Sequence, residues 1–292
     1  MFTRSVRVSP FAIILVICFF LGYHFTQNPI STDLAYYAAP HGHTTTEKSG
    51  KGNGQRVALV TFVTEERSYL HASLKGKAHY TRRHGYDFII DYEAHADRGT
   101  MWWKFEMIAR LIREKKYDWL WWIDFDTLIT NTDIKLTDII EETLANVTNP
   151  GEIDYLLTHD CNGLNMGSFV VRAHERSIKF FKDTAAIEQG EREKDDQLSE
   201  QDAMVKLLKD DPATARRTVL VPQWKLNAFP EEIACFDQAN IGWSPGTFVL
   251  HFAGAWAHVE GEDPTGQLMK KYEDQVIWGD WEELWPGPRV TD

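Results

Sequence analysis

The apolar positions of this chain follow two different periods. Arg56 to Val63 (RVALVTFV) is a continuous β-branched run typical of a central parallel strand, and residues 69–83 after it are predicted to be helical. The run YDFIIDYE predicts a second strand. Residues 101–116 carry apolar side chains at helical spacing and lead into WLWWI, a third predicted strand. This alternation predicts an open, mostly parallel α/β sheet, whose ligands bind beyond the carboxyl ends of its strands.

The second half of the folded part repeats both patterns. IDYLLT, MGSFVVR and TFVLHFAG predict further strands, and residues 175–188 and 200–209 predict helices. No internal repeat is visible in the sequence. With 292 residues, 43% of them hydrophobic and 13% aromatic, the chain can bury one sizeable core, so one large domain is expected.

The N-terminus carries a membrane signal. Arg4 and Arg7 precede an uncharged apolar run from Val8 to Phe25, whose strictly apolar part is shorter than the ~20 residues of a spanning helix. It suits either a signal-peptide core or an uncleaved signal anchor. Because no small-residue cleavage pattern follows closely, we favour the anchor.

Basic residues before a span place the N-terminus in the cytosol and the remainder across the membrane. The small, polar stretch that follows the apolar run predicts a flexible stem. A short span also favours the thin membranes of the early secretory pathway. The predicted organisation is a cytoplasmic tail (1–7), a signal-anchor transmembrane helix (8–26), a stem (27–54) and a lumenal folded domain (55–292).

Two aspartates, Asp124 and Asp126, close the tryptophan-rich third strand. An extended chain sends residues i and i+2 to the same side, and two carboxylates that close repel unless they are solvated or share a cation. Strand-ending turn residues are the alternative. His251 ends the later apolar run FVLHFAG; it suits a metal ligand or a hydrogen-bonded core histidine. Two carboxylates and one imidazole suit Mn²⁺ or Mg²⁺, and the histidine favours Mn²⁺.

The net charge of the chain limits the class of ligand that it can bind. A formal net charge of -12 argues against a nucleic-acid surface, because phosphate backbones are bound through clustered Lys and Arg. A metal ion would therefore supply the positive charge for a phosphorylated ligand. A metal that bridges two phosphates stabilises the charge on a departing nucleoside diphosphate, which is the chemistry of glycosyl transfer.

Two other functions compete with this interpretation. A haloacid-dehalogenase-type phosphohydrolase carries D-x-D-x-T, but here the fifth position is Leu128 and Thr127 comes one place early. A non-catalytic subunit of a Golgi transferase complex is the second alternative. It would use Trp278, Trp281 and Trp285 as a binding patch, although such residues more often close over a core.

Five segments in order resemble one known family: MWWKFEMIARLI, WWIDFDTLITN, GLNMGSFVVR, SEQDAMVKLL and FVLHFAGAW. The set resembles glycosyltransferase family 34, which holds fungal Golgi α-mannosyltransferases and α-galactosyltransferases together with plant xyloglucan xylosyltransferases. The resemblance covers residues 56–257. It implies a GT-A fold, a nucleotide-sugar donor, Mn²⁺ and transfer with retention of anomeric configuration.

The resemblance assigns roles to single residues. Asp124 and Asp126 match the D-x-D of the family, and His251 matches the histidine that completes the metal shell. Lys104 resembles a lysine on the donor side, with a solvated helix residue as the alternative. Asn165 and Gly167 resemble the segment that lines the donor sugar, with a plain turn before a strand as the alternative.

Gln201 matches the glutamine that the family places beneath the anomeric carbon. The xylosyltransferases carry two acids just before it, whereas this chain has Ser199 and Glu200 there and Asp202 on the far side. Glu200 and Asp202 are therefore the candidate acids of the catalytic segment, and a helix start capped by Ser199 is the alternative. A neutral amide is a poor nucleophile, which favours front-face attack with Gln201 steadying the charge on the sugar ring.

The resemblance also narrows donor, acceptor and location. Trp256 stands where the xylosyltransferases carry a lysine, which favours the fungal branch and a hexose donor, GDP-mannose first and UDP-galactose close behind. The acceptor would be a glycan on a glycoprotein or oligosaccharide, and the location the Golgi membrane, alone or in complex with other Golgi transferases.

Two smaller features depend on that location. Asn146, Val147 and Thr148 form an N-glycosylation sequon, usable if this part of the chain is lumenal. Cys161 and Cys235 would pair in an oxidising lumen, and two buried thiols are the alternative.

Overall fold

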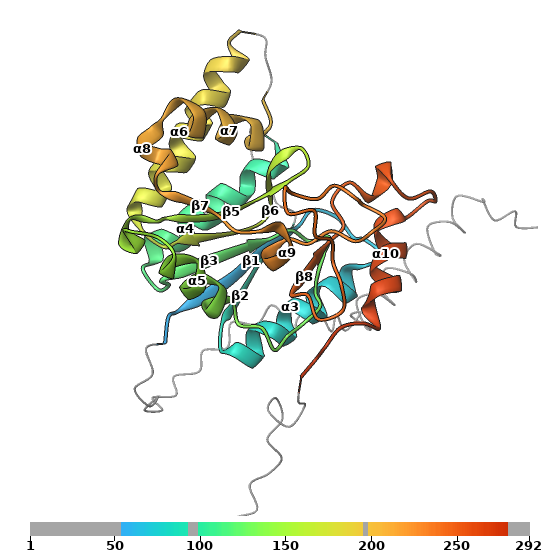
Figure 1. The fold of residues 1–292 in the computed structure, drawn as a ribbon. Coiled ribbons are helices and arrows are strands. Elements are labelled where there is room, and N and C mark those ends of the chain that lie inside the picture. Colours follow the sequence, from blue (N-terminus) through green and yellow to red (C-terminus); the bar gives the residue numbers. More distant parts are fainter. Residues whose placement is uncertain (1–53, 93–98, 195–197, 280–292) are drawn as a thin grey trace, which may run out of the picture. The chain divides into compact units, whose positions relative to one another are not determined.

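The computed structural model describes residues 54–92, 99–194 and 198–279, drawn in colour in Figure 1. The predicted tail and anchor, and the stem up to residue 53, lie outside the described residues. Within the described ranges no helix combines the length and apolar character that a membrane crossing requires. The opening alternation is confirmed as β1 (Val57–Val63), α3 (Leu70–His84), β2 (Asp87–Tyr92), η1 (Thr100–Trp102), α4 (Trp103–Glu114) and β3 (Trp119–Ile123).

A six-stranded sheet forms the centre of the fold, with strand order β2-β1-β3-β6-β5-β7. The added strands are β5 (Tyr155–Asp160), β6 (Gly163–Arg172) and β7 (Thr218–Leu220). β6 pairs antiparallel with β3 and β5, whereas the other pairings are parallel, so the predicted mostly parallel sheet is confirmed. Because β6 runs against its neighbours, its first residues lie at the edge where β3 and β5 end.

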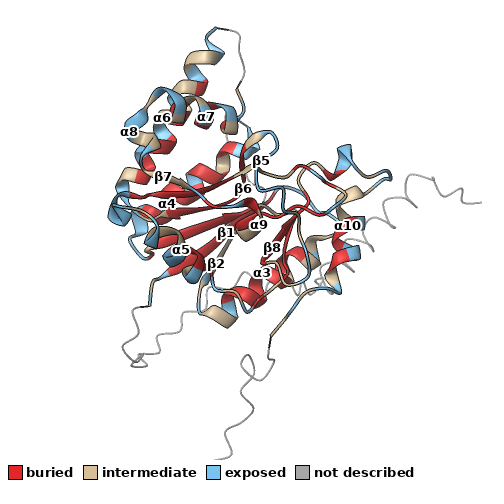
Figure 2. Cartoon of the chain, viewed as in Figure 1, coloured by how far each residue is buried: buried red, intermediate tan, exposed pale blue. Residues whose placement is uncertain are grey.

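Helices cover both faces of this sheet (Figure 1). On one face Trp122 packs in a core with Phe105 of α4 and with Phe181; on the other, Trp121 stacks on Phe248 with ring centroids 5.3 Å apart. This two-sided burial explains why WLWWI is apolar throughout, and Figure 2 shows β1 and β3 as buried. The remaining helices are α5 (Leu136–Ala145), η2 (Pro150–Glu152), α6 (Glu175–Arg192), α7 (Glu200–Asp210), α8 (Pro212–Ala215), α9 (Gln223–Leu226), η3 (Ala255–Ala257) and α10 (Pro264–Glu273).

A second, two-stranded sheet joins distant parts of the chain. β4 (Thr127–Ile129) pairs antiparallel with β8 (Val249–His251), and Thr127 stands opposite His251. The run TFVLHFAG therefore contributes only a three-residue strand, outside the main sheet. Its register brings His251 beside the turn that holds the two aspartates.

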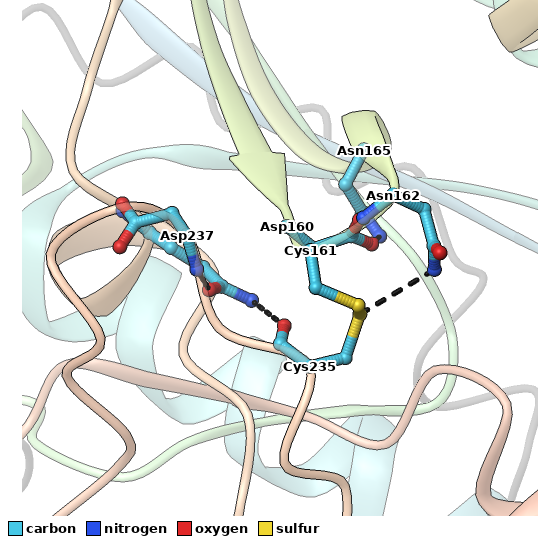
Figure 3. Close-up of a disulfide and its surroundings, with 7 residues drawn as sticks. Asp160, Cys161, Asn162, Asn165, Cys235 and Asp237 are labelled. Carbon is cyan, nitrogen blue, oxygen red and sulfur yellow. Dashed lines mark hydrogen bonds between the residues drawn. A yellow bond between two sulfur atoms is a disulfide. The ribbon is translucent and has the colours of Figure 1, made fainter.

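Cys161 and Cys235 form a disulfide with an S–S distance of 2.07 Å. It ties the tip of the β5–β6 hairpin to the loop after α9, and Figure 3 shows Asn162 directed at the Cys235 sulfur. The disulfide alternative is thus confirmed and the two-thiol alternative is wrong.

Candidate active site

Asp124 and Asp126 lie in a turn between β3 and β4, at the carboxyl end of β3. The turn is closed by Thr127, whose hydroxyl donates to the Asp124 carbonyl at 2.7 Å. The indole of Trp122 donates to the Asp124 carboxylate at 2.7 Å. The two acids therefore come together through a turn rather than through the extended backbone that their spacing predicts.

Asp124, Asp126 and His251 form one group in which a ligand atom from each lies within 4.8 Å of the others. Nε2 of His251 is 3.2 Å from Oδ1 of Asp126, and the Phe252 amide donates to the Asp126 carbonyl at 3.0 Å. His251 is buried, whereas the Asp126 side chain is 29% exposed. Two carboxylates and one imidazole at this separation, open to solvent on one side, fit Mn²⁺ or Mg²⁺.

The surroundings shift the pKa values of these three groups in different directions. Burial raises the pKa of Asp124, and the neighbouring Asp126 carboxylate adds to that shift against the opposing charge of Lys104. Burial also acts to raise the pKa of Asp126, but the imidazole, a backbone hydrogen bond and Lys77 together outweigh it, so the net shift is downward. Burial acts to lower the pKa of His251, yet Asp126 raises it overall. A divalent cation would favour the ionised form of both carboxylates and the neutral imidazole.

The His251 ring is held between Gly167 and Phe229. A methyl group at Gly167 would stand 2.1 Å from Cε1 of His251, so only glycine leaves room for the ring. Phe229 packs edge-on against the other part of the ring at a centroid distance of 5.5 Å. His251 is therefore both a buried, hydrogen-bonded histidine and a member of the candidate metal group.

Asn165 and Gly167 lie inside β6, not in a turn before it. Asn165 donates to the Asp160 carboxylate at 2.8 Å and accepts from the Gly167 amide at 2.9 Å. The Gly167 carbonyl in turn accepts from the Asp124 amide at 2.7 Å. The first residues of β6 thus back the acid turn directly.

Lys104 and Glu200 form a buried ion pair, with 3.0 Å between Nζ and Oε1 and side-chain exposures of 1% and 8%. The ammonium group lies 5.7 Å from the ring centre of Trp122. The alternative that Lys104 is a solvated helix residue is therefore wrong. The pair joins α4 to the start of α7 directly behind the strand that carries the acids.

Gln201 reaches the same edge of the sheet, where its carbonyl oxygen accepts from the Met166 amide at 2.7 Å. Asp202 is exposed, and Ser199 caps α7 through the Asp202 amide. The helix-start alternative is thus confirmed for Ser199, and it coexists with the placement of Gln201 near β6. The carboxylate of Asp202 accepts from the Ser199 hydroxyl at 2.7 Å.

Lys77 of α3 is a site residue that the sequence did not single out. It is fully buried, and its ammonium group donates to Ser73 at 2.7 Å and to the Thr127 carbonyl at 3.0 Å. Burial lowers the pKa of Lys77 to about 7, against the opposing charges of Asp126 and Asp124. The Lys77 amine thus lies beneath the acid turn.

A cavity of about 220 Å³ opens in front of the acid turn. It is lined by Phe62, Thr64, Glu65, Arg67, Tyr69, Met101, Trp122, Asp124, Phe125 and Asp126. A larger hollow of about 820 Å³ lies between α4 and α6, but neither the acids nor the imidazole lines it. The smaller cavity is therefore the candidate ligand site, because of the two it alone is lined by Asp124 and Asp126.

The sequence of this chain is similar to a known protein family and to individual fungal proteins. Residues 54–146 and 139–261 match the galactosyl transferase GMA12/MNN10 family. A probable alpha-1,2-galactosyltransferase of Schizosaccharomyces pombe is 26% identical over 247 residues, 73% of this chain and 70% of that protein. A probable alpha-1,6-mannosyltransferase of Saccharomyces cerevisiae is 29% identical over 187 residues, 54% of this chain and 47% of that protein.

A solved structure resembles the fold. The glycosyltransferase involved in glycosylation of the major capsid of PBCV-1 superposes with a TM-score of 0.55 at 15% identity, covering 74% of this chain and 99% of that one. Together with the mostly parallel sheet, this likeness identifies the fold as GT-A-like.

Proposed function

Because this chain belongs to the galactosyl transferase GMA12/MNN10 family of glycosyltransferases, we propose that it transfers a hexose from a nucleotide-sugar donor to a glycan acceptor with the help of a divalent ion. The observation that carries the proposal is the convergence of Asp124, Asp126 and His251 beside the cavity. The family membership removes the phosphohydrolase alternative.

The metal ligands in this proposal are Asp124, Asp126 and His251. Two carboxylates and one imidazole favour Mn²⁺, with Mg²⁺ as the alternative. When bound there, the ion would neutralise the diphosphate of the donor and stabilise the charge on the leaving nucleoside diphosphate. Two acids and a histidine leave further coordination positions for phosphate oxygens. Thr64, Glu65, Arg67 and Tyr69 line the same cavity, and in this proposal they would contact the nucleoside.

We propose transfer with retention through attack from the face of the leaving group. The new bond forms between the acceptor oxygen and the anomeric carbon, the bond to the diphosphate breaks on the same face, and a phosphate oxygen takes the acceptor's proton. Glu200 is paired with Lys104 and Asp202 with the Ser199 hydroxyl, so neither carboxylate is free of partners for a covalent step. Gln201 keeps one carbonyl lone pair beyond its bond to Met166 for the developing charge on the sugar.

We also propose that the folded part lies in the lumen of the secretory pathway, in the Golgi, behind a single N-terminal anchor. The disulfide between Cys161 and Cys235 supports an oxidising compartment. Asn146 of the sequon is exposed at the end of α5, where an oligosaccharyl group could be attached. Treatment of the wild-type protein with a glycosidase that removes N-glycans should lower its mass. The Asn146→Gln variant should show no such change. An unchanged mass of the wild-type protein would not support a lumenal location.

A donor screen tests the activity. Full-length protein purified in detergent is incubated with Mn²⁺ and either UDP-galactose or GDP-mannose, and linkage analysis identifies the product formed on an oligosaccharide acceptor. We place UDP-galactose first, because the galactosyltransferase relative matches a greater share of this chain than the mannosyltransferase relative does. Turnover of neither donor, with or without acceptor, would favour a non-catalytic subunit.

The aromatic patch suggested for such a subunit has one described member. Trp278 packs edge-on against His79 at 5.0 Å, and the Lys75 ammonium group lies 4.9 Å from its ring centre. Trp278 therefore packs against α3, as tryptophans that close over a core do. Trp281 and Trp285 lie outside the described residues.

A further inference from the structure

Asn227, in the segment that follows α9, lies fully buried behind the candidate metal group. Its side chain lies 2.8 Å from Nδ1 of His251, on the ring edge opposite Asp126. It also contacts Thr158 at 3.1 Å and Asn165 at 2.8 Å. A buried amide that touches the histidine and the β5–β6 hairpin is placed to control which nitrogen of His251 carries hydrogen.

The donor and acceptor roles in these contacts can be assigned by starting at Asn165, the residue farthest from His251. An ionised carboxylate only accepts and a backbone amide only donates, so Asn165 must turn its NH₂ to Asp160 and its oxygen to Gly167. Figure 3 shows Asn165 and Asp160 together near the tip of the β5–β6 hairpin. The Asn165 oxygen is thereby an acceptor, and the group that Asn227 presents to it must be the NH₂.

The orientation of Asn227 then determines the tautomer of His251. With its NH₂ directed at Asn165, Asn227 turns its oxygen to His251, and an oxygen can only accept from Nδ1–H. In the neutral ring Nε2 is then bare, with its lone pair directed toward the side where Asp126 lies. Metal-bound histidines use such a lone pair while the other ring nitrogen donates to a neighbouring group.

The backbone holds Asn227 in that place. The His251 amide donates to the Ala228 carbonyl at 2.8 Å, and the Ala228 amide donates to the Val249 carbonyl at 3.2 Å. Ala228, the residue after Asn227, is thus bonded to β8 through both its amide and its carbonyl. Asn227 and His251 cannot shift independently without breaking these bonds.

We propose that Asn227 is a positioning residue that holds His251 in the Nδ1–H tautomer and so presents Nε2 to the divalent ion, an inference that rests on the proposed metal-dependent function. Asn227 touches neither substrate nor ion; it acts through the imidazole. Loss of such an outer contact lowers metal affinity by roughly 10- to 100-fold in known metal sites.

The test uses the full-length protein labelled with ¹⁵N-histidine and calorimetric titration with Mn²⁺ in the presence of UDP or GDP. In the metal-free wild type, above the pH at which the ring becomes neutral, the His251 signals should show hydrogen on Nδ1. Asn227→Leu should lose this preference and bind Mn²⁺ roughly 10- to 100-fold more weakly. Asn227→Asp keeps an acceptor for Nδ1–H but loses the NH₂ that contacts Thr158 and Asn165, so it should recover the tautomer and bind Mn²⁺ more tightly than Asn227→Leu does.

Gln223→Leu is the matched control. Gln223 is another fully buried amide of the same segment, bonded to the Cys235 carbonyl at 3.3 Å and the Asp237 amide at 2.8 Å. It should lose stability without changing the Mn²⁺ affinity or the His251 signals. A wild-type ring protonated on Nε2, or equal Mn²⁺ affinities for Asn227→Leu and Gln223→Leu, would overturn this inference alone. Absence of Mn²⁺ binding in the wild type would overturn the proposed function instead.

Discussion

His251 places its Nε2 3.2 Å from the Asp126 carboxylate, although one residue ends β8 and the other lies in the turn after β3. The antiparallel pairing of β4 with β8 produces this approach, because Thr127 stands opposite His251 and Phe252 donates to the Asp126 carbonyl. The candidate metal group is therefore assembled by strand register. Substitutions of residues that hold Asp124, Asp126 and His251 in place should therefore weaken metal binding, even though these three side chains stay intact.

Gly167→Ala should displace the imidazole. The added methyl group would stand 2.1 Å from Cε1 of His251, so the buried ring would have to shift from its place beside Asp126. We expect the Mn²⁺ dissociation constant to rise on the order of 10-fold or more. Gly76→Ala in α3 meets no atom within 4 Å and should leave the affinity unchanged. Equal affinities for the two variants would contradict the close contact.

Lys104→Met should strongly destabilise the fold, because it leaves the Glu200 carboxylate buried without its partner. Removing one member of a buried pair costs about 3–5 kcal/mol, which urea unfolding would measure. The double variant Lys104→Met, Glu200→Gln should recover part of that loss. On α7 the exposed Lys206 pairs with Asp210, and Lys206→Met should have no measurable effect. A small loss for Lys104→Met would show that water reaches the pair.

The metal-free protein should become more stable as the pH rises from 7 to 9. Folding lowers the pKa of Lys77 from 10.5 to about 7, so the unfolded chain binds more protons than the folded chain in this window. The free energy of unfolding should rise by about 1.4 kcal/mol per pH unit for one full proton. Urea unfolding at several pH values measures the slope, and Lys77→Met should flatten it. An unchanged slope in that variant would assign the effect to other groups.

Loss of the disulfide should lower stability without removing the fold's core. Cys161 and Cys235 close a loop with a sequence separation of 74 residues. Loop-closure entropy alone predicts a loss of about 4 kcal/mol for the double serine variant, measured by urea unfolding. Wild-type protein treated with reductant should show the same loss. If oxidised and reduced protein unfold at the same urea concentration, the bond does not constrain the unfolded chain.

Periodicity predicted most of the architecture, because burial on both faces leaves continuous apolar strands and burial on one face leaves helical spacing. It could not give the direction of β6, since an apolar run carries no orientation. A two-residue turn at Cys161 and Asn162 reverses the chain there. The length of the strand at His251 was also overestimated, because the apolar run continues past the three residues that pair.

The candidate metal group could be proposed from the sequence only through the family resemblance, because a close pair of acids and a histidine ending an apolar run each have ordinary structural explanations. Asn227 and Lys77 were not visible. Each is a buried polar residue whose role depends on partners far along the chain, Asn165 and His251 for the first and the Thr127 carbonyl for the second. No local spacing signals such contacts, so only the folded arrangement reveals them.

Titration of metal-free protein with Mn²⁺ in the presence of saturating UDP or GDP, followed by electron paramagnetic resonance of the free ion, tests the central claim most directly. The account predicts one bound Mn²⁺ per wild-type chain and loss of that binding in both Asp126→Asn and His251→Ala. Undiminished binding in either variant would contradict the assembly of one ion site from these residues.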